Sequence, residues 1–386
     1  DSNVAIGESA LSSDTLGSRS VAIGDSALYA QNFTTATDAY NVAIGYAAGN
    51  AIQTGVQNTL IGGLAGDALT VGKENVALGY AALTTDIAGG RTTAIGYGAL
   101  ESQVNPNFGG TVVNAYNVAV GFDAGNAVTT GVENTLIGGL AGDALTDADS
   151  NVAVGDFALG ADTLGSRSTA LGSRALENQN FTTATNTYNT AVGFHAGNDI
   201  TTGVNNTLIG GNAGDALTDA DFNVAIGTNS LSSDTLGSIS IAIGHAALEN
   251  QNFATATNTY NVAIGHVAGQ SVTSAVKSTF VGHLAGDATT TGNYNTFFGY
   301  DAGGSNVDGG QNTIFGAGSQ TAATGGDYAN GFGFSLSCVA GYTTLGENAN
   351  DIRAAHGNVT WATVSDQRYK KDIVDSTAGL SFINAL

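Results

Sequence analysis

The stretch "NVAIGYAAGN" at residues 41–50 contains the pattern on which the fold of this chain depends. Its first five residues alternate β-branched and small side chains with a period of two, which is typical of a β-strand. The density of β-branched residues and glycines excludes a helix. We therefore expect Val42 and Ile44 to point to one face of a strand, and Asn41, Ala43 and Gly45 to the other.

The same phrase recurs along nearly the whole chain, with variants such as "NTLIG" at 58–62 and 134–138. The step between closing glycines is 17 residues, but it lengthens to 21 at three places and to 25 at one. The residue two before the glycine changes from Ala to Leu60, Leu136, Leu208 and Phe280 at steps of 76, 72 and 72, so the unit of duplication is four coils. The closing glycines are Gly7, Gly24, Gly45, Gly62, Gly79, Gly96, Gly121, Gly138, Gly155, Gly172, Gly193, Gly210, Gly227, Gly244, Gly265, Gly282, Gly299 and Gly316.

Seventeen residues suffice for two short strands and two turns, and coils of equal length can stack in parallel about 4.8 Å apart. The sequence thus predicts an all-β fold, a parallel β-solenoid or β-roll of about eighteen 17-residue coils over residues 1–320. Residues 321–364 do not repeat and are expected to form a neck. Stacking should also align one asparagine per coil into a hydrogen-bonded ladder. These asparagines include Asn41, Asn58, Asn75, Asn117, Asn134 and Asn151.

A single coil offers few large aliphatic side chains, and we expect its Ala and Gly face to lie open. A solenoid with a thin core and an open flat side should associate with other chains. The physics of the sequence therefore favours an oligomer without giving the number of chains.

Composition narrows the class of protein. The chain has 56 Gly, one Pro, no Met and a formal charge of −22, so nucleic acid and anionic membranes would repel it. No apolar run is long enough to span a bilayer, and no signal peptide is apparent. The single cysteine, Cys338, cannot form an internal disulfide and is interpreted as a buried apolar residue.

The repeats "NVAIG" and "NTLIGGLAGDAL" resemble the head repeats of trimeric adhesins of the YadA type and the related repeats of phage tail fibres. The resemblance covers residues 1 to about 320. It implies a left-handed β-roll and a homotrimer in which three rolls form one bundle.

The end of the chain, "TWATVSDQRYKKDIVDSTAGLSFINAL" at 360–386, is basic and does not repeat. It resembles the start of the self-cleaving intramolecular chaperone domain of the endosialidase type. That resemblance implies autoproteolysis between Val364 and Ser365, with Ser365 and Lys370 as the catalytic pair and Asp366 and Arg368 in support. Residues 365–386 would then be the start of a truncated α+β chaperone.

The residue types suit this chemistry, because a serine hydroxyl needs a base and lysine serves only when its pKa is lowered. Arg368 and Lys371 could supply the positive charge that lowers the pKa of Lys370. The alternative is that Ser365 and Asp366 merely begin a turn beside a solvated basic run.

Two further groups of side chains are candidate metal sites. "GDALTDADS" and "GDALTDADF" could gather oxygen ligands for calcium, although no metal or other cofactor is expected, since most such clusters are solvated turns. His245, His266 and His283 should form a column at a position held elsewhere by tyrosine and phenylalanine, where packing is the alternative to a metal site. The carboxylates in question are Asp143, Asp147, Asp149, Asp215, Asp219 and Asp221.

The four lengthened coils each insert one phenylalanine and end on tyrosine. Aromatic loops on a rigid scaffold suit contact with a carbohydrate or a surface protein. The alternative is that each phenylalanine packs against a neighbouring chain and seals the trimer. The pairs are Phe33 with Tyr40, Phe108 with Tyr116, Phe181 with Tyr188, and Phe253 with Tyr260.

The leading hypothesis is a trimeric phage tail fibre on the virion, which attaches to a host cell-surface glycan or protein, contacts other tail proteins and is processed at its C-terminal chaperone. The alternative is the head of a bacterial trimeric autotransporter adhesin on the bacterial cell surface. A tailspike depolymerase would need one carboxylate pair in a distinct environment, whereas these carboxylates repeat with the coils. No activity on a substrate is therefore expected.

Overall fold

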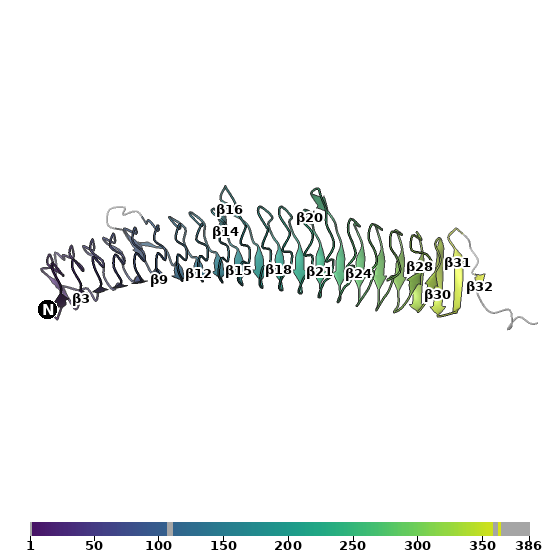
Figure 1. The fold of residues 1–386 in the computed structure, drawn as a ribbon, viewed down its shortest axis with the longest axis horizontal. Helices are drawn as coiled ribbons and strands as arrows, with labels where there is room; N and C mark the ends of the chain where they lie inside the picture. Colours follow the sequence, from purple (N-terminus) through teal and green to yellow (C-terminus); the bar gives the residue numbers. More distant parts are fainter. Residues whose placement is uncertain (1, 106–110, 358–361, 364–386) are drawn as a thin grey trace, which may run out of the picture.

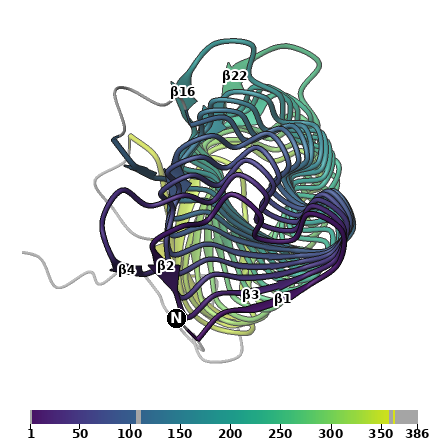
Figure 2. The same ribbon diagram turned by 90° about the vertical axis from the view of Figure 1, so that its left-hand side faces the viewer.

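The computed structural model describes residues 2–105, 111–357 and 362–363. They form a parallel β-solenoid of about 20 coils, which confirms the predicted fold class. The coils stack along one long, gently curved rod (Figure 1), and the view from its end shows them lying over one another (Figure 2). No described residue lies in a helix, so none of this part of the chain forms a helix that could cross a membrane.

One sheet runs along the rod and receives one strand from each coil. Its strands are parallel from β1 to β30, and each pairs with the strands of the coils before and after it. The strands are β1 (Val4–Ile6), β3 (Val21–Ile23), β5 (Val42–Ile44), β6 (Thr59–Ile61), β7 (Val76–Leu78), β9 (Thr93–Ile95), β11 (Val118–Val120), β12 (Thr135–Ile137), β13 (Val152–Val154), β15 (Thr169–Leu171), β17 (Thr190–Val192), β18 (Thr207–Ile209), β19 (Val224–Ile226), β21 (Ile241–Ile243), β23 (Val262–Ile264), β24 (Thr279–Val281), β25 (Thr296–Phe298), β26 (Thr313–Phe315), β28 (Asn330–Phe334), β30 (Tyr342–Glu347), β31 (Asn350–Ala355) and β32 (Ala362–Thr363).

The lengthened coils keep the register of this sheet. Across the 25-residue coil, Val118 still pairs with Thr93, so the extra residues leave the strand positions unchanged. They form short pairs with the preceding coil on another side of the rod instead. These two-stranded parallel sheets are β2 (Gly17–Ser18) with β4 (Thr37–Asp38), β8 (Gly89–Gly90) with β10 (Val113–Asn114), β14 (Gly165–Ser166) with β16 (Thr185–Asn186), and β20 (Gly237–Ser238) with β22 (Thr257–Asn258); β27 (Gln320–Thr321) with β29 (Ser337–Cys338) is a fifth, near the end of the rod.

The direction of the strand side chains reverses one expectation. Ala43 at the centre of its strand is fully buried, while Val42 and Ile44 on either side are only partly buried and point outward. The expectation that the Ala face lies open was therefore wrong. Leucines from the turns, such as Leu28 and Leu83, fill the narrow interior and leave room for only a methyl group on the strand.

The coil with Leu60 shows the same limit on volume. Leu60 replaces the strand alanine, and the turns beside it carry Gly49 and Gly66 where other coils have leucine. A Cβ at Gly49 would lie 2.8 Å from Cδ1 of Leu60, and one at Gly66 would lie 2.9 Å from its Cδ2. One large side chain thus fills the space that two turns leave empty.

The predicted asparagine ladder is present and fully buried. Oδ1 of Asn41 accepts from the backbone amide of Asn58 at 3.0 Å, and Nδ2 of Asn58 donates to the carbonyl of Gly72 at 2.9 Å. Each asparagine therefore satisfies backbone groups of its neighbouring coils, which would otherwise be buried without partners. The ladder is mainly a series of side-chain to backbone bonds.

The parallel stack continues beyond residue 320. β28 pairs with β26, and β30 pairs with β28 over five residues, so two further coils lie in the segment expected to be a neck. After them, β31 and β32 add to the sheet in the antiparallel direction. Cys338 lies in this end region; it is fully buried, as expected, and burial raises the pKa of its thiol to about 11.

Candidate binding surfaces

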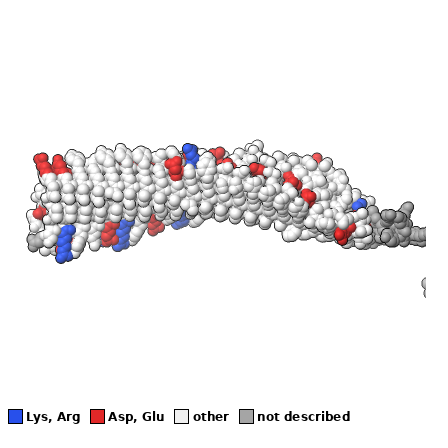
Figure 3. Space-filling view, turned by 60° about the horizontal axis from the view of Figure 1, so that its bottom comes forward, with Lys and Arg blue, Asp and Glu red and all other residues white. Residues whose placement is uncertain are grey.

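The outer face of the main sheet is uncharged and largely apolar along the rod. From β1 to β26, the outward first and third residues of each strand are Val, Ile, Leu, Phe or Thr, and none is charged. Many are well exposed, for example Ile6, Leu171 and Phe298 at 59%, 44% and 50% of their surface. Figure 3 brings forward the side of the rod on which these strands lie, and charged side chains are sparse there.

The tyrosines of the lengthened coils all occupy one position, directly before the ladder asparagine. Tyr40, Tyr116, Tyr188 and Tyr260 are each about half exposed, at 48% to 52% of their surface. The backbone at this position has a positive φ, near 52° for all four. The geometry turns the ring away from the core, so these residues are available to another molecule.

Three of these tyrosines are paired with an arginine of the preceding coil. The guanidinium groups of Arg19, Arg91 and Arg167 donate to the hydroxyls of Tyr40, Tyr116 and Tyr188, respectively. Each guanidinium also lies over the ring of its own tyrosine, at 5.4, 5.6 and 5.8 Å from the ring centroid in the same order. Sequence reasoning missed these pairs, although an arginine two residues before the main strand precedes three of the four lengthened coils. The fourth tyrosine, Tyr260, lies beside Ile239 instead.

The phenylalanines of the same coils are placed differently. Phe33, Phe181 and Phe253 are 5%, 6% and 8% exposed within their own chain. Their rings are therefore covered within the chain itself and leave little surface for a receptor or a neighbouring chain. Phe108 lies outside the described residues.

The predicted histidine column is present. His245, His266 and His283 are exposed and stacked, with centroids 5.1 and 4.9 Å apart and ring planes 14° and 22° apart. In nearly parallel rings the in-plane nitrogen lone pairs do not converge, whereas two nitrogens on one zinc ion lie within about 4 Å of each other. The column is therefore a packing feature in this geometry.

The carboxylates of the acidic turns accept hydrogen bonds from neighbouring coils. Oδ1 of Asp149 accepts from the amide of Val132 at 2.9 Å, and Oδ1 of Asp147 accepts from the hydroxyl of Thr130 at 2.6 Å; Asp221 and Asp219 repeat both contacts. Asp143 and Asp215 lie apart from these contacts, half-buried in the turn after the main strand, where burial raises the pKa of each. Within the described ranges, no group of three or more His, Cys, Asp or Glu side chains could hold a metal ion.

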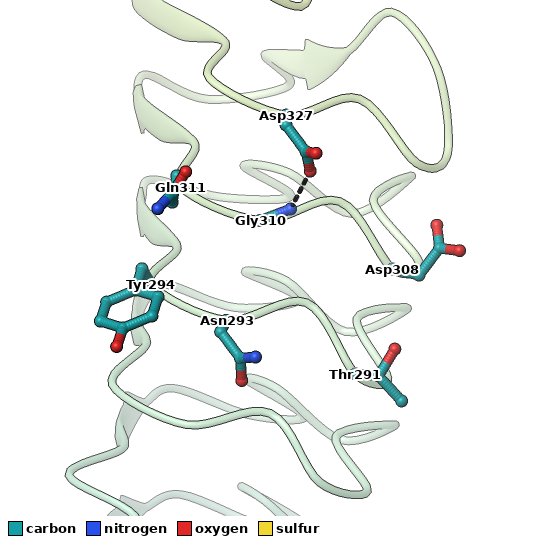
Figure 4. A pocket seen from close by; sticks show the side chains of 7 residues that line it. All are labelled: Thr291, Asn293, Tyr294, Asp308, Gly310, Gln311 and Asp327. Carbon is teal, nitrogen blue, oxygen red and sulfur yellow. Dashed lines mark hydrogen bonds between the residues drawn. The ribbon is translucent and has the colours of Figure 1, made fainter.

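Two shallow grooves lie on the sides of the rod. One, of about 280 Å³, is lined by Tyr294 together with polar side chains, including Asn293, Asp308 and Asp327 (Figure 4). In it, Asp327 accepts from the amide of Gly310 at 2.7 Å. The other, of about 450 Å³, lies against the first lengthened coil and is lined by residues that include Tyr29, Asn32, Thr34 and Gln53. Both combine one aromatic ring with amide and hydroxyl groups.

The residues predicted for self-cleavage, Ser365, Asp366, Arg368 and Lys370, lie outside the described residues, as does the chaperone segment 365–386. A scan against protein-family models, a search of curated proteins and a search of solved structures each found no match.

Proposed function

We propose that the chain is the rod of a trimeric tail fibre that attaches a phage virion to a host cell-surface glycan or protein. The observation that carries the proposal is the uncharged apolar face of the main sheet. Monomeric proteins rarely expose large contiguous apolar patches, and such patches commonly mark contact with another chain. That the assembly contains three chains is what the motif resemblance to trimeric adhesin heads and tail fibres implies.

The shape of the face supports a contact between like chains. Its two columns of outward residues repeat at every coil in the same register, so a second copy offers a complementary surface along the same length. Because these residues are β-branched or aromatic in most coils, they pack with little loss of side-chain entropy. Charges lie outside the face, where water still reaches them in an assembly.

A matched pair of substitutions tests the trimer. Leu171 lies on the sheet face and Leu16 lies off it, and the two are equally exposed, at 44% and 45%. Leu171→Lys would place three ammonium groups near one threefold axis, away from water, and should dissociate the trimer or lower its stability sharply. Leu16→Lys should leave the trimer intact.

Sedimentation equilibrium of the wild type and both variants gives the answer. A wild type that sediments as a monomer, or a Leu171→Lys variant that stays trimeric, contradicts the proposal. Circular dichroism controls for unfolding of the variant.

For the end of the chain we propose the processing step that its motif implies, cleavage between Val364 and Ser365 by Ser365 with Lys370. The support is the sequence context from 360 to 386. Intact mass of the full gene product with Ser365→Ala beside the wild type tests it. If both proteins keep the full-length mass and differ only by the one oxygen atom that the substitution removes, self-cleavage there is ruled out.

A further inference from the structure

Three aromatic side chains form an exposed stack on one side of the rod. Tyr80, Tyr97 and Phe122 each follow the closing glycine of successive coils, and their centroids are 5.5 and 5.6 Å apart with planes 19° and 14° apart. All three are exposed over about half of their surface. The coils on either side of the stack carry Gly63 and Gly139 at the same position. The outer faces of Tyr80 and Phe122 therefore point toward coils that have no side chain there.

Each glycine position is bordered by one side chain of the next coil, and no backbone of another coil crowds it. A Cβ at Gly63 would have within 4 Å only two ring atoms of Tyr80, at 3.4 and 3.7 Å, and a Cβ at Gly139 would have only Oδ1 of Asp156, at 3.3 Å. The next coils beyond carry Tyr46, 63% exposed, and Asp156. The Gly63 gap thus lies between Tyr80 and Tyr46, and the Gly139 gap lies between Phe122 and Asp156.

The fourth repeat shows what such a gap can hold. The position of Gly63 and Gly139 is occupied there by His283. Its imidazole stacks between His266 and Tyr300, with centroids 4.9 and 5.4 Å away. A distance of two coils therefore accommodates one flat ring in contact with a ring on each side.

We infer that the Gly63 and Gly139 gaps each bind one pyranose ring of a neutral glycan, an inference that rests on the proposed attachment function and names its ligand class. The C–H face of a pyranose packs on an aromatic ring, and its hydroxyl edge needs hydrogen-bonding groups. The hydroxyls of Tyr46 and Tyr80 and the carboxylate of Asp156 supply them. The chain charge of −22 favours neutral over acidic sugars.

An aromatic side chain of a partner protein fits the same gaps less well. In the Gly139 gap phenylalanine would cover the carboxylate of Asp156 without offering it a hydrogen bond, which is unfavourable, and tyrosine or tryptophan could offer it only one. A sugar with vicinal hydroxyls satisfies that carboxylate. The two gaps are four coils apart, about 19 Å, so one polysaccharide chain can occupy both and bind with higher avidity.

The test uses the 386-residue chain and saturation-transfer-difference NMR with three probes, the methyl glycosides of glucose, galactose and mannose. Filling both gaps with Gly63→His and Gly139→His should reduce the signal of the bound pyranoside by about tenfold, the upper range for loss of aromatic stacking. Both glycines have ordinary φ values and His283 occupies the equivalent place, so the double variant should fold.

Two single variants serve as controls. Leu16→His, at an exposed position before β2 and away from this column of residues, should leave the signal unchanged, and His283→Gly should add signal by opening a gap between His266 and Tyr300. No signal with any of the three probes, an undiminished signal in the double variant, or stronger binding of N-acetyltyrosinamide than of the sugars would overturn the inference. Sedimentation of the same samples separates the two proposals, because a trimer that binds no sugar refutes only this one.

Discussion

Gln179 donates from Nε2 to Oδ2 of Asp162 on the neighbouring coil at 2.6 Å, and both side chains are fully buried. Oδ1 of the same carboxyl accepts from the amides of Gly165 and Phe181, at 3.0 and 3.1 Å. The arrangement recurs every four coils, with Gln103 on Asp86 and Gln251 on Asp234, both at 2.6 Å. Burial raises the pKa of all three carboxyl groups above the ordinary 3.8, while these hydrogen bonds oppose the rise.

These buried acids predict that the rod is most stable at acidic pH. A carboxyl group whose pKa is higher in the folded than in the unfolded state binds its proton more tightly when folded. The free energy of unfolding should therefore fall as the pH rises from the unfolded pKa through the folded one. Denaturant midpoints between about pH 4 and pH 7 measure this, and the three sites add because they lie on distant coils.

A pair of variants assigns the effect. Asp162→Asn removes one of the titrating groups and should lessen the pH dependence, whereas Thr182→Ala, at an exposed residue that does not titrate, should not change it. Stability that increases with pH, or a slope that Asp162→Asn leaves unchanged, would contradict the assignment to the buried acids.

The closing glycines should tolerate no side chain. Gly138 has a φ of +139°, and a Cβ on it would lie 2.4 Å from the carbonyl oxygen of Gly155 on the next coil. Gly138→Ala should therefore destabilise the rod by several kcal/mol, since both coils must move apart. Gly211→Ala is the control, because nothing lies within 4 Å of its Cβ and the residue has an ordinary φ. Equal midpoints of thermal unfolding for the two variants would contradict this prediction.

Loss of one ladder asparagine should break bonds on two coils. Oδ1 of Asn134 accepts from the amide of Asn151 at 2.9 Å, and its Nδ2 donates to the carbonyl of Ala148 at 2.8 Å. Asn134→Ala leaves both backbone groups buried without partners and should cost about 2–4 kcal/mol. Amide exchange should increase at Asn151 and on its neighbouring coils, because solenoids open locally. Uniform loss of protection along the rod would argue against a local effect.

Ile239 offers a stabilising change. It has a φ of 62°, a region that β-branched residues rarely adopt, and it stands where Arg19, Arg91 and Arg167 pair with tyrosine. Ile239→Arg should relieve the extra strain that β-branching adds at this φ, which Arg19, Arg91 and Arg167 also adopt, and should place a guanidinium over Tyr260. A raised thermal midpoint, lower again after Tyr260→Ala, is the expected result. A midpoint at or below that of the wild type would mean that no strain is stored at this position.

The sequence was sufficient for the solenoid, its four-coil repeat and its asparagine ladder, because glycine spacing and the alternation of "NVAIG" encode them directly. It did not reveal that Ala43 faces inward, since alternation alone does not say which face is the core. That choice depends on Leu28 and Leu83, which enter the same space from the turns. The Arg19–Tyr40 pair was missed for a related reason, because the two residues belong to different coils of unequal length.

The buried Asp162–Gln179 pair also acts as a check on coil order. Each such carboxyl finds its glutamine only on the next coil, and the pairs recur every four coils rather than at every one. If a folding chain skipped one coil, a carboxyl group would be buried beside apolar side chains without the glutamine amide that donates to it. The misfolded coil would therefore be destabilised at that position. The coils of this chain are otherwise alike, so these sparse polar contacts favour the correct order of coils during folding.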